Sequence, residues 1–179
     1  MLRNTADRFG SVSKFLHWVI ALLVVVMLIA GYFMTDIAND ALKGQVINLH
    51  KLTGITILFL MIIRLLWALA NPKPRLPKGT PWFEHWLEWA GHFTLYALII
   101  AQPITGWVGS VAGGHIPHAG SVMLNLPLSQ NKSLAGDSFQ LHDILAIAII
   151  VVVSLHVLAA LYHHFVRRDN ILKRMMPST

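Results

Sequence analysis

The sequence contains no cysteine among its 179 residues. This absence excludes disulfide bonds, thiolate metal sites, cysteine-ligated iron–sulfur clusters and cysteine nucleophiles. Charged side chains are also scarce, at 12% of the chain, whereas soluble domains contain about 25%. Together with a hydrophobic content of 55%, this scarcity excludes a disordered chain and predicts one domain that lies in a membrane.

Four segments are long and apolar enough to cross a bilayer as helices, because a hydrocarbon core of about 30 Å needs about 20 such residues. They span residues 15–34, 49–70, 89–111 and 141–166. The first is interpreted as a retained helix and not a signal peptide, since no A-x-A-like cleavage site follows it. Strands are excluded because the segments are too few to close a barrel. We therefore predict an all-α transmembrane four-helix bundle that forms a single domain over residues 1–179.

The basic residues predict how the bundle is oriented. All but three of the 14 Lys and Arg residues lie near the N-terminus, around the second connection or near the C-terminus, and the exceptions are Lys43, Lys51 and Lys132. The second connection accounts for Arg64, Lys73, Arg75 and Lys78. The positive-inside rule then predicts that both termini are cytoplasmic and that residues 112–140 form a long periplasmic loop between helices 3 and 4. The net charge of +6 indicates anionic membrane lipids as partners and not nucleic acid, since no basic patch is interleaved with aromatic residues.

The connection before the third segment has a distinct composition. Residues 71–81 are rich in proline, and residues 82–88 (WFEHWLE) contain two tryptophans. Because tryptophan prefers the headgroup level of a membrane, residues 82–88 are predicted to form a short amphipathic turn at the interface.

The ten histidines of this apolar chain are the main candidates for function. Six of them lie within or at the ends of the four segments: His17, His50, His92, His142, His156 and His163. Proton relays usually combine histidine with carboxylates, and zinc sites cluster their ligands, but these histidines are dispersed and Asp143 is the only acidic residue in the segments. Neutral imidazoles from facing helices are the axial ligands that a b-type heme requires.

The histidine spacing predicts two heme sites at two depths of the membrane. His142 and His156 are 14 residues apart, which is about 21 Å along a helix and nearly the same face. By depth, His50 pairs with His142 near the periplasmic side, and His17 pairs with His156 near the cytoplasmic side. The residues four positions after these four histidines are all small, as a flat porphyrin requires: Ala21, Gly54, Ala146 and Ala160. His92, Met27 and Met61 are the alternative ligands.

A quinone site is predicted at the cytoplasmic end. His163 follows His156 by seven residues, about 10 Å further along nearly the same face, and could donate a hydrogen bond to a quinone carbonyl. Lys14 lies one turn before His17 and could assist. The alternative for His163 is a plain contact with lipid headgroups, and Arg64 either snorkels or pairs with a heme propionate. The sequence does not decide the roles of His85, His92, His115 and His118. The three in connections are predicted to be solvated, and the alternative for His115 and His118 is a place at the entry to the outer heme.

Several motifs resemble the prokaryotic cytochrome b561 family in order and spacing. They are SKFLHW at residues 13–18, LHKLTGI at 49–55, RLLW at 64–67, GHFTLY at 91–96, PITG at 103–106, LH at 141–142, LHVLAALYHHF at 155–165 and KRMMP at 173–177. The resemblance implies a four-helix inner-membrane protein with two heme b groups and quinone as an electron partner. It implies His17, His50, His142 and His156 as the heme-iron ligands, whereas His92 matches a family position that is not a ligand. One branch of the family oxidises superoxide with ubiquinone.

The resulting hypothesis is a transmembrane diheme cytochrome that transfers electrons from a periplasmic donor, with superoxide as one candidate, to membrane ubiquinone. The alternative is a membrane-anchoring cytochrome b subunit that couples a periplasmic redox protein to the quinone pool. A transporter or proton channel is disfavoured, because carboxylates and repeat symmetry are missing.

Overall fold

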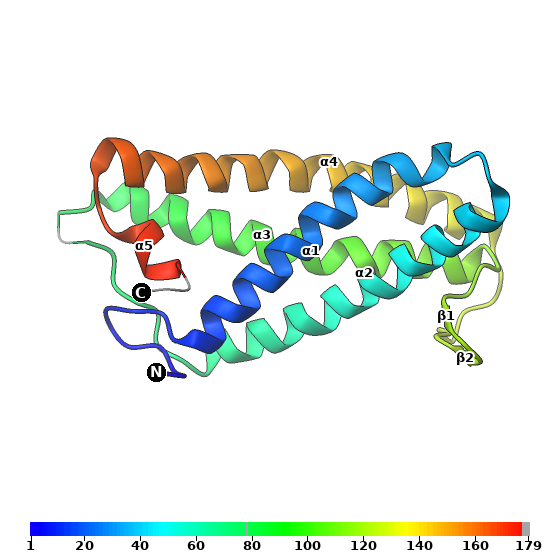
Figure 1. Cartoon of the computed structure of the whole chain (residues 1–179), viewed down its shortest axis with the longest axis horizontal. Helices are drawn as coiled ribbons and strands as arrows, with labels where there is room; N and C mark the ends of the chain where they lie inside the picture. The colour runs from blue at the N-terminus through cyan, green and yellow to red at the C-terminus, as the bar shows by residue number, and fades with distance from the viewer. Residues whose placement is uncertain (78, 177–179) are drawn as a thin grey trace.

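The chain folds into a bundle of four long helices (Figure 1). The computed structural model describes residues 1–77 and 79–176, so Lys78 of the second connection and Pro177 of the C-terminal motif lie outside the described residues. The long helices are α1 (Ser11–Phe33), α2 (Asp40–Leu69), α3 (Trp82–Ala112) and α4 (Lys132–Tyr162). A 3-10 turn, η1 (Met34–Asp36), follows α1, and a π-helical turn, η2 (His163–Arg167), leads from α4 to the short helix α5 (Ile171–Met175).

All four long helices have the length and hydropathy of membrane spans. The four-helix prediction is therefore confirmed, but the predicted starts were too late by four to nine residues. Hydropathy finds only the lipid-immersed part, whereas a 31-residue helix such as α3 extends about 46 Å. The true starts of α2 and α4 are set by polar caps, because the side chains of Asn39 and Asn131 accept hydrogen bonds from Leu42 N (2.9 Å) and Leu134 N (3.1 Å).

Residues 82–88 do not form a separate interfacial turn. They are the first two turns of α3, and Pro81 precedes them in an extended conformation. The amphipathic pattern that suggested a turn is the polar entry of a membrane-spanning helix, which retains its helical period through the headgroup layer. The prediction of a separate turn is therefore wrong.

The helices pack unevenly around the interior. Helix α3 packs most extensively against α4, α2 contacts both α1 and α3, and the backbones of α1 and α2 are not closely packed against that of α4 over the described residues. A small core is formed by Leu16, Ile20, Val24, Ile57, Met61 and Ile149. Large apolar side chains on the outer faces, such as Phe59 and Leu158, are exposed, as a lipid environment requires.

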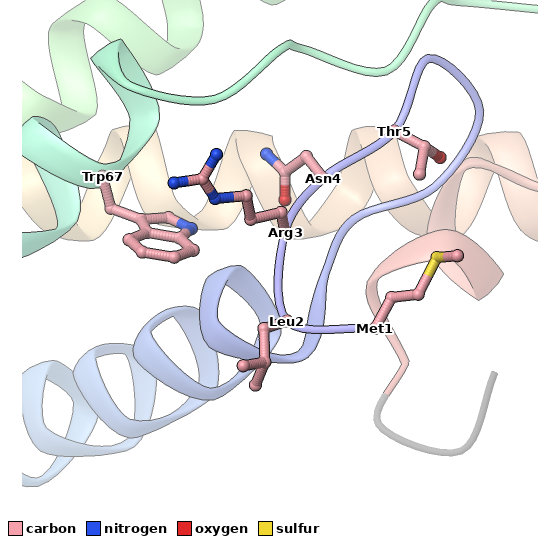
Figure 2. Close-up of a pocket in the computed structure, with 6 residues that line it drawn as sticks. All are labelled: Met1, Leu2, Arg3, Asn4, Thr5 and Trp67. Atoms are coloured by element: carbon pink, nitrogen blue, oxygen red, sulfur yellow. The ribbon is translucent and has the colours of Figure 1, made fainter.

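Both termini lie at one end of the bundle (Figure 1). This end is held together by contacts between three segments distant in sequence. Asn4 Nδ2 donates to Pro72 O (3.1 Å), Arg75 N donates to Ala6 O (2.8 Å), and Trp18 Nε1 donates to Met175 O (2.8 Å). Figure 2 shows residues 1–5 beside Trp67, around a cavity of about 500 Å³. The N-terminal segment, the second connection and α5 therefore form a cap on this end.

A small β-hairpin covers the opposite end. Strands β1 (His118–Ala119) and β2 (Val122–Met123) pair antiparallel within residues 113–131, so the third connection is shorter than the predicted 112–140. Asn48 of α2 pairs with the backbone of His118 in both directions, at 2.8 and 3.1 Å, and Lys51 Nζ donates to His115 O (2.8 Å). These bonds fix the hairpin against α2 beside His50.

Candidate functional site

Two histidine pairs face each other inside the bundle. The ring centroids of His50 (α2) and His142 (α4) are 6.4 Å apart, and those of His17 (α1) and His156 (α4) are 6.3 Å apart. A metal–imidazole bond is about 2 Å long and the ring nitrogen lies about 1 Å from the ring centre, so two rings on opposite sides of one metal have centroids about 6 Å apart. Both pairs join α4 to a helix whose backbone does not pack closely on it. The spacing therefore fits a planar metal group held between two rings.

The pair of His50 and His142, here the outer pair, lies at the hairpin end and is oriented by α3. His142 Nδ1 lies 2.9 Å from Gln102 O, and because a carbonyl only accepts, Nδ1 carries the proton. The Thr105 hydroxyl oxygen is 3.2 Å from the same nitrogen. This contact fixes the tautomer and leaves Nε2 as the free donor of an electron pair, which is the usual arrangement of a metal-binding histidine.

Two glycines make room for the outer pair. A Cβ atom at Gly106 of α3 would lie 2.8 Å from Cε1 of His142, and one at Gly31 of α1 would lie 3.3 Å from Cε1 of His50. Any side chain at Gly106 would therefore displace the ring, since real Cβ contacts essentially never fall below 3.0 Å. The sequence analysis missed both glycines as site residues, although an isolated glycine inside an apolar helix signals a close approach.

His50 adds a second sign that the outer pair is a ligand site. Its Nδ1 atom is buried and has no hydrogen-bond partner within the described part of the chain. Buried polar nitrogens are nearly always paired, and coordination to a metal is one way in which an imidazole nitrogen is satisfied.

The pair of His17 and His156, here the inner pair, lies toward the end that carries the termini, and two further polar side chains approach it. His92 of α3 has its ring centroid 5.5 Å from that of His156, which is closer than rings on opposite sides of one metal. The Nδ1 atom of His92 donates to Glu88 O at 2.7 Å, within its own helix. His92 thus neighbours the inner pair, and its geometry favours a supporting contact over coordination.

Arg64 brings a positive charge to the inner pair. Its Nε donates to the Tyr96 hydroxyl at 3.1 Å, and the guanidinium lies within electrostatic reach of both His17 and His156. One guanidinium nitrogen is buried and has no hydrogen-bond partner among the described residues. A carboxylate such as a heme propionate would pair with this group.

The two methionine alternatives pack against apolar residues and glycine. Met61 is buried in the core cluster with Leu16 and Ile20, and the Met27 methyl group packs toward Gly54. His85 is exposed on the first turn of α3, while His115 and His118 are exposed in the hairpin connection.

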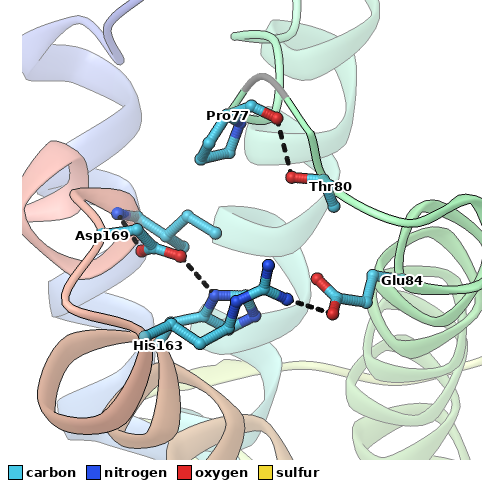
Figure 3. Close-up of polar contacts among 7 residues, drawn as sticks. Pro77, Thr80, Glu84, His163 and Asp169 are labelled. Carbon is cyan, nitrogen blue, oxygen red and sulfur yellow. Dashed lines mark hydrogen bonds and ion pairs between the residues drawn. The ribbon is translucent and has the colours of Figure 1, made fainter.

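Lys14 and His163 both lie at the end that carries the termini, but they have different neighbours. Lys14 is buried and lines a cavity of about 360 Å³, together with Arg8, Asn170, Lys173 and Arg174. His163 Nδ1 lies 2.6 Å from Asp169 Oδ2 (Figure 3). Arg167 pairs with Glu84 of α3. The sequence did not predict the Asp169 contact, because it depends on the π-helical turn.

The donor set fits a heme site. Among residues 1–77 and 79–176, no three His, Asp or Glu side chains cluster as a protein-only metal site would need. Two opposed neutral imidazoles suffice only where the metal brings its other ligands with it, as iron does in a porphyrin. The small or absent side chains beside the rings, at Gly106 and Gly31, suit the flat macrocycle.

Known proteins resemble this chain over most of its length. A family model described as prokaryotic cytochrome b561 matches residues 8–178. The chain belongs to the prokaryotic cytochrome b561 family. It is 34% identical over 176 residues to cytochrome b561 homolog 2 of Escherichia coli strain K12, covering 97% of this chain and 93% of that protein. It is also 34% identical over 163 residues to the probable superoxide oxidase CybB of Yersinia pestis, covering 90% and 92%.

Membership settles the general class of the protein. A prokaryotic cytochrome b561 is a heme b protein of membrane electron transport that works with quinone and other redox partners. The four apolar helices agree with a multi-pass protein of the bacterial inner membrane. The resemblance noted in the sequence is thereby confirmed.

Proposed function

We propose that this cytochrome b561 binds two hemes and transfers electrons across the membrane from a periplasmic donor to ubiquinone. The proposal rests on one observation: two pairs of facing histidine rings lie at two levels of one bundle. Their α4 members are separated by about 21 Å of helix, most of the thickness of a bilayer core. A single heme would need only one such pair.

The protein's own residues would hold and tune the two groups. Heme b supplies reversible one-electron transfer when it is bound. His50 and His142 would hold the outer group, with Gln102 O fixing the tautomer of His142. His17 and His156 would hold the inner group, and the Arg64 guanidinium beside it would bind a propionate and favour the reduced state electrostatically.

The proposed orientation places the end that carries the termini in the cytoplasm. The basic residues Arg8, Lys14, Lys173 and Arg174 gather there around one cavity. Such a concentration supports the cytoplasmic side, where positive charge is retained during insertion. The hairpin and the outer pair would then face the periplasm.

We place the quinone near the inner pair, with His163 as a hydrogen-bond donor to a carbonyl oxygen. Lys14 is proposed to assist from the neighbouring basic cavity. Both residues lie at the same end of the bundle as His17 and His156, so an electron at the inner site would have a short path to the quinone.

Superoxide is the donor that we propose first. One relative bears the name probable superoxide oxidase, which supports this substrate. The outer end offers Lys43, Lys51 and Lys132 against Asp36, Asp40, Asp137 and Asp143, so it forms no strong cationic funnel for an anion. This balance gives weight to a second candidate, a subunit that takes electrons from a periplasmic redox protein docked at the hairpin, where Val122 and Met123 are exposed.

Rapid mixing of the oxidised protein with superoxide tests the proposed donor. We expect heme absorption to convert to the reduced form within the mixing experiment, and added ubiquinone to return it to the oxidised form. If superoxide leaves the hemes oxidised while a quinol reduces them, the oxidase proposal is wrong and the subunit candidate replaces it.

The Arg64→Gln variant tests the electrostatic role at the inner site. Removing one positive charge should lower the midpoint potential of the inner heme by about 50 mV, since a charge at about 10 Å in a partly polar interior contributes on the order of 1 kcal/mol. A spectroscopic redox titration measures this, with Arg64→Lys as the charge-preserving control. An unchanged potential in Arg64→Gln would show that the guanidinium does not act on the heme.

A further inference from the structure

The end of α4 carries an imidazole–carboxylate pair that electron transfer alone does not explain. His163 Nδ1 and Asp169 Oδ2 are 2.6 Å apart, and the two side chains are only 19% and 18% exposed. An exposed ion pair contributes little to stability, but this pair is largely buried at the edge of the membrane. Its position therefore calls for a functional explanation.

The backbone between the two residues is shaped to bring them together. Residues 163–167 form a π-helical turn, Arg168 adopts a left-handed conformation (φ 55°, ψ 33°), and Asp169 N donates to His163 O at 3.1 Å. π-Helical turns are rare and occur frequently at functional sites, and a left-handed conformation is uncommon for a residue other than glycine. An ordinary helix end would point Asp169 away from His163.

Both oxygens of Asp169 are committed. Oδ1 accepts from Ile171 N at 3.0 Å, which starts α5, and Oδ2 accepts from His163 Nδ1. With Nδ1–H directed at Asp169, only Nε2 of His163 can face a ligand. A carboxylate that holds an imidazole in this way orients the ring and stabilises the imidazolium when it forms.

We propose that His163 and Asp169 act together as the proton-donating pair for the quinone, with Nε2 of His163 as the donor and Asp169 as its positioning partner. This inference rests on the proposed function for the electrons and the quinone. It adds the source of the protons, because converting a quinone to a quinol takes two electrons and two protons. The electrons come from the periplasmic donor.

Each proton transfer breaks the Nε2–H bond of the protonated His163 ring and forms an O–H bond on a quinone carbonyl oxygen. The ring is left neutral, with Nδ1–H still bonded to Asp169, which stays ionised. Water at the cytoplasmic end then returns a proton to Nε2, and a second cycle completes the quinol. The remaining exposure of both side chains gives water this access.

The Asp169→Asn variant separates proton delivery from folding. The asparagine side-chain oxygen can still accept from Ile171 N, whereas its NH₂ group cannot accept from His163 Nδ1. The control is Asp7→Asn, which removes the same charge from an exposed position at the same end of the bundle. Both variants keep every residue proposed to hold heme.

Three readouts are taken on the full-length protein with its hemes, in detergent with a soluble ubiquinone analogue. In Asp169→Asn we expect heme content and heme reduction in the absence of quinone to match the wild type. We expect kcat for quinone reduction to fall about 100-fold, the low end of general acid catalysis, while KM changes less than about threefold. The solvent deuterium effect on kcat should increase, because proton transfer becomes limiting. Asp7→Asn should behave as the wild type.

The outcomes distinguish the inference from the function on which it rests. A wild type whose reduced hemes are not reoxidised by quinone overturns the proposed function, and the pair with it. Normal quinone reduction by Asp169→Asn overturns the pair alone. If Asp169→Asn fails to assemble, His163→Gln is measured in its place, and an unchanged kcat and deuterium effect there also overturn the pair.

Discussion

We expect the His142→Ala variant to purify with one heme b per polypeptide instead of two. The variant removes the α4 ring of the outer pair and leaves His50 to face an alanine methyl group. A single axial imidazole on one side would not retain the group, because the hydrogen bond from His142 to Gln102 O, which holds the ring in its ligand tautomer, is lost as well. Heme content per polypeptide, from the pyridine hemochrome spectrum, measures the change.

The matched control is His92→Ala. His92 is also a helix histidine next to a paired ring, with its centroid 5.5 Å from His156, yet the geometry favours a supporting role. We expect this variant to keep two hemes. If His92→Ala lost one heme while His142→Ala kept both, the assignment of ligands would be wrong.

The Gly106→Ala variant should also lose most of the outer heme, although it changes no candidate ligand. The new Cβ would lie 2.8 Å from Cε1 of His142, so the ring must move out of line with His50. A ligand displaced by a few tenths of an ångström loses coordination geometry, and a change at the shell around a metal ligand commonly costs 10- to 100-fold in affinity. We expect the heme ratio to fall toward one, with the spectrum of the inner heme unchanged.

Gly91→Ala on the same helix is the control, because a Cβ atom there meets nothing within 4 Å. It should keep both hemes and should not weaken α3, since alanine is the better helix former. If Gly106→Ala kept two hemes with an unaltered spectrum, the His142 ring would not be coordinated in the position that the structure gives it.

Much of the fold could be predicted from hydropathy, because a membrane demands about 20 apolar residues per helix and forbids unpaired backbone. The predictions failed for the parts of the chain outside the bilayer core. Helix α2 begins at Asp40 and α4 at Lys132, where asparagine caps in water decide the boundary and hydropathy carries no signal. Residues 82–88 were misassigned because the helical period of α3 continues through the headgroup layer, where the sequence becomes polar.

The site could be predicted in part. The 14-residue spacing of His142 and His156 suggested two depths, and the structure brings each next to the predicted partner ring. An isolated glycine signals a close approach, but the partner of that approach could not be foreseen, because Gln102 and Gly106 approach His142 from another helix at a register that sequence does not reveal. The contact between Asp169 and His163 could not be predicted either, since a regular helix would have separated the two residues.

The most direct test of the account is the heme content of the purified wild-type protein, measured together with its reduced-minus-oxidised absorption spectrum. We predict two heme b groups per polypeptide, with two components in a redox titration, one for each histidine pair. A protein that binds a single heme when fully loaded, or none, would contradict the account.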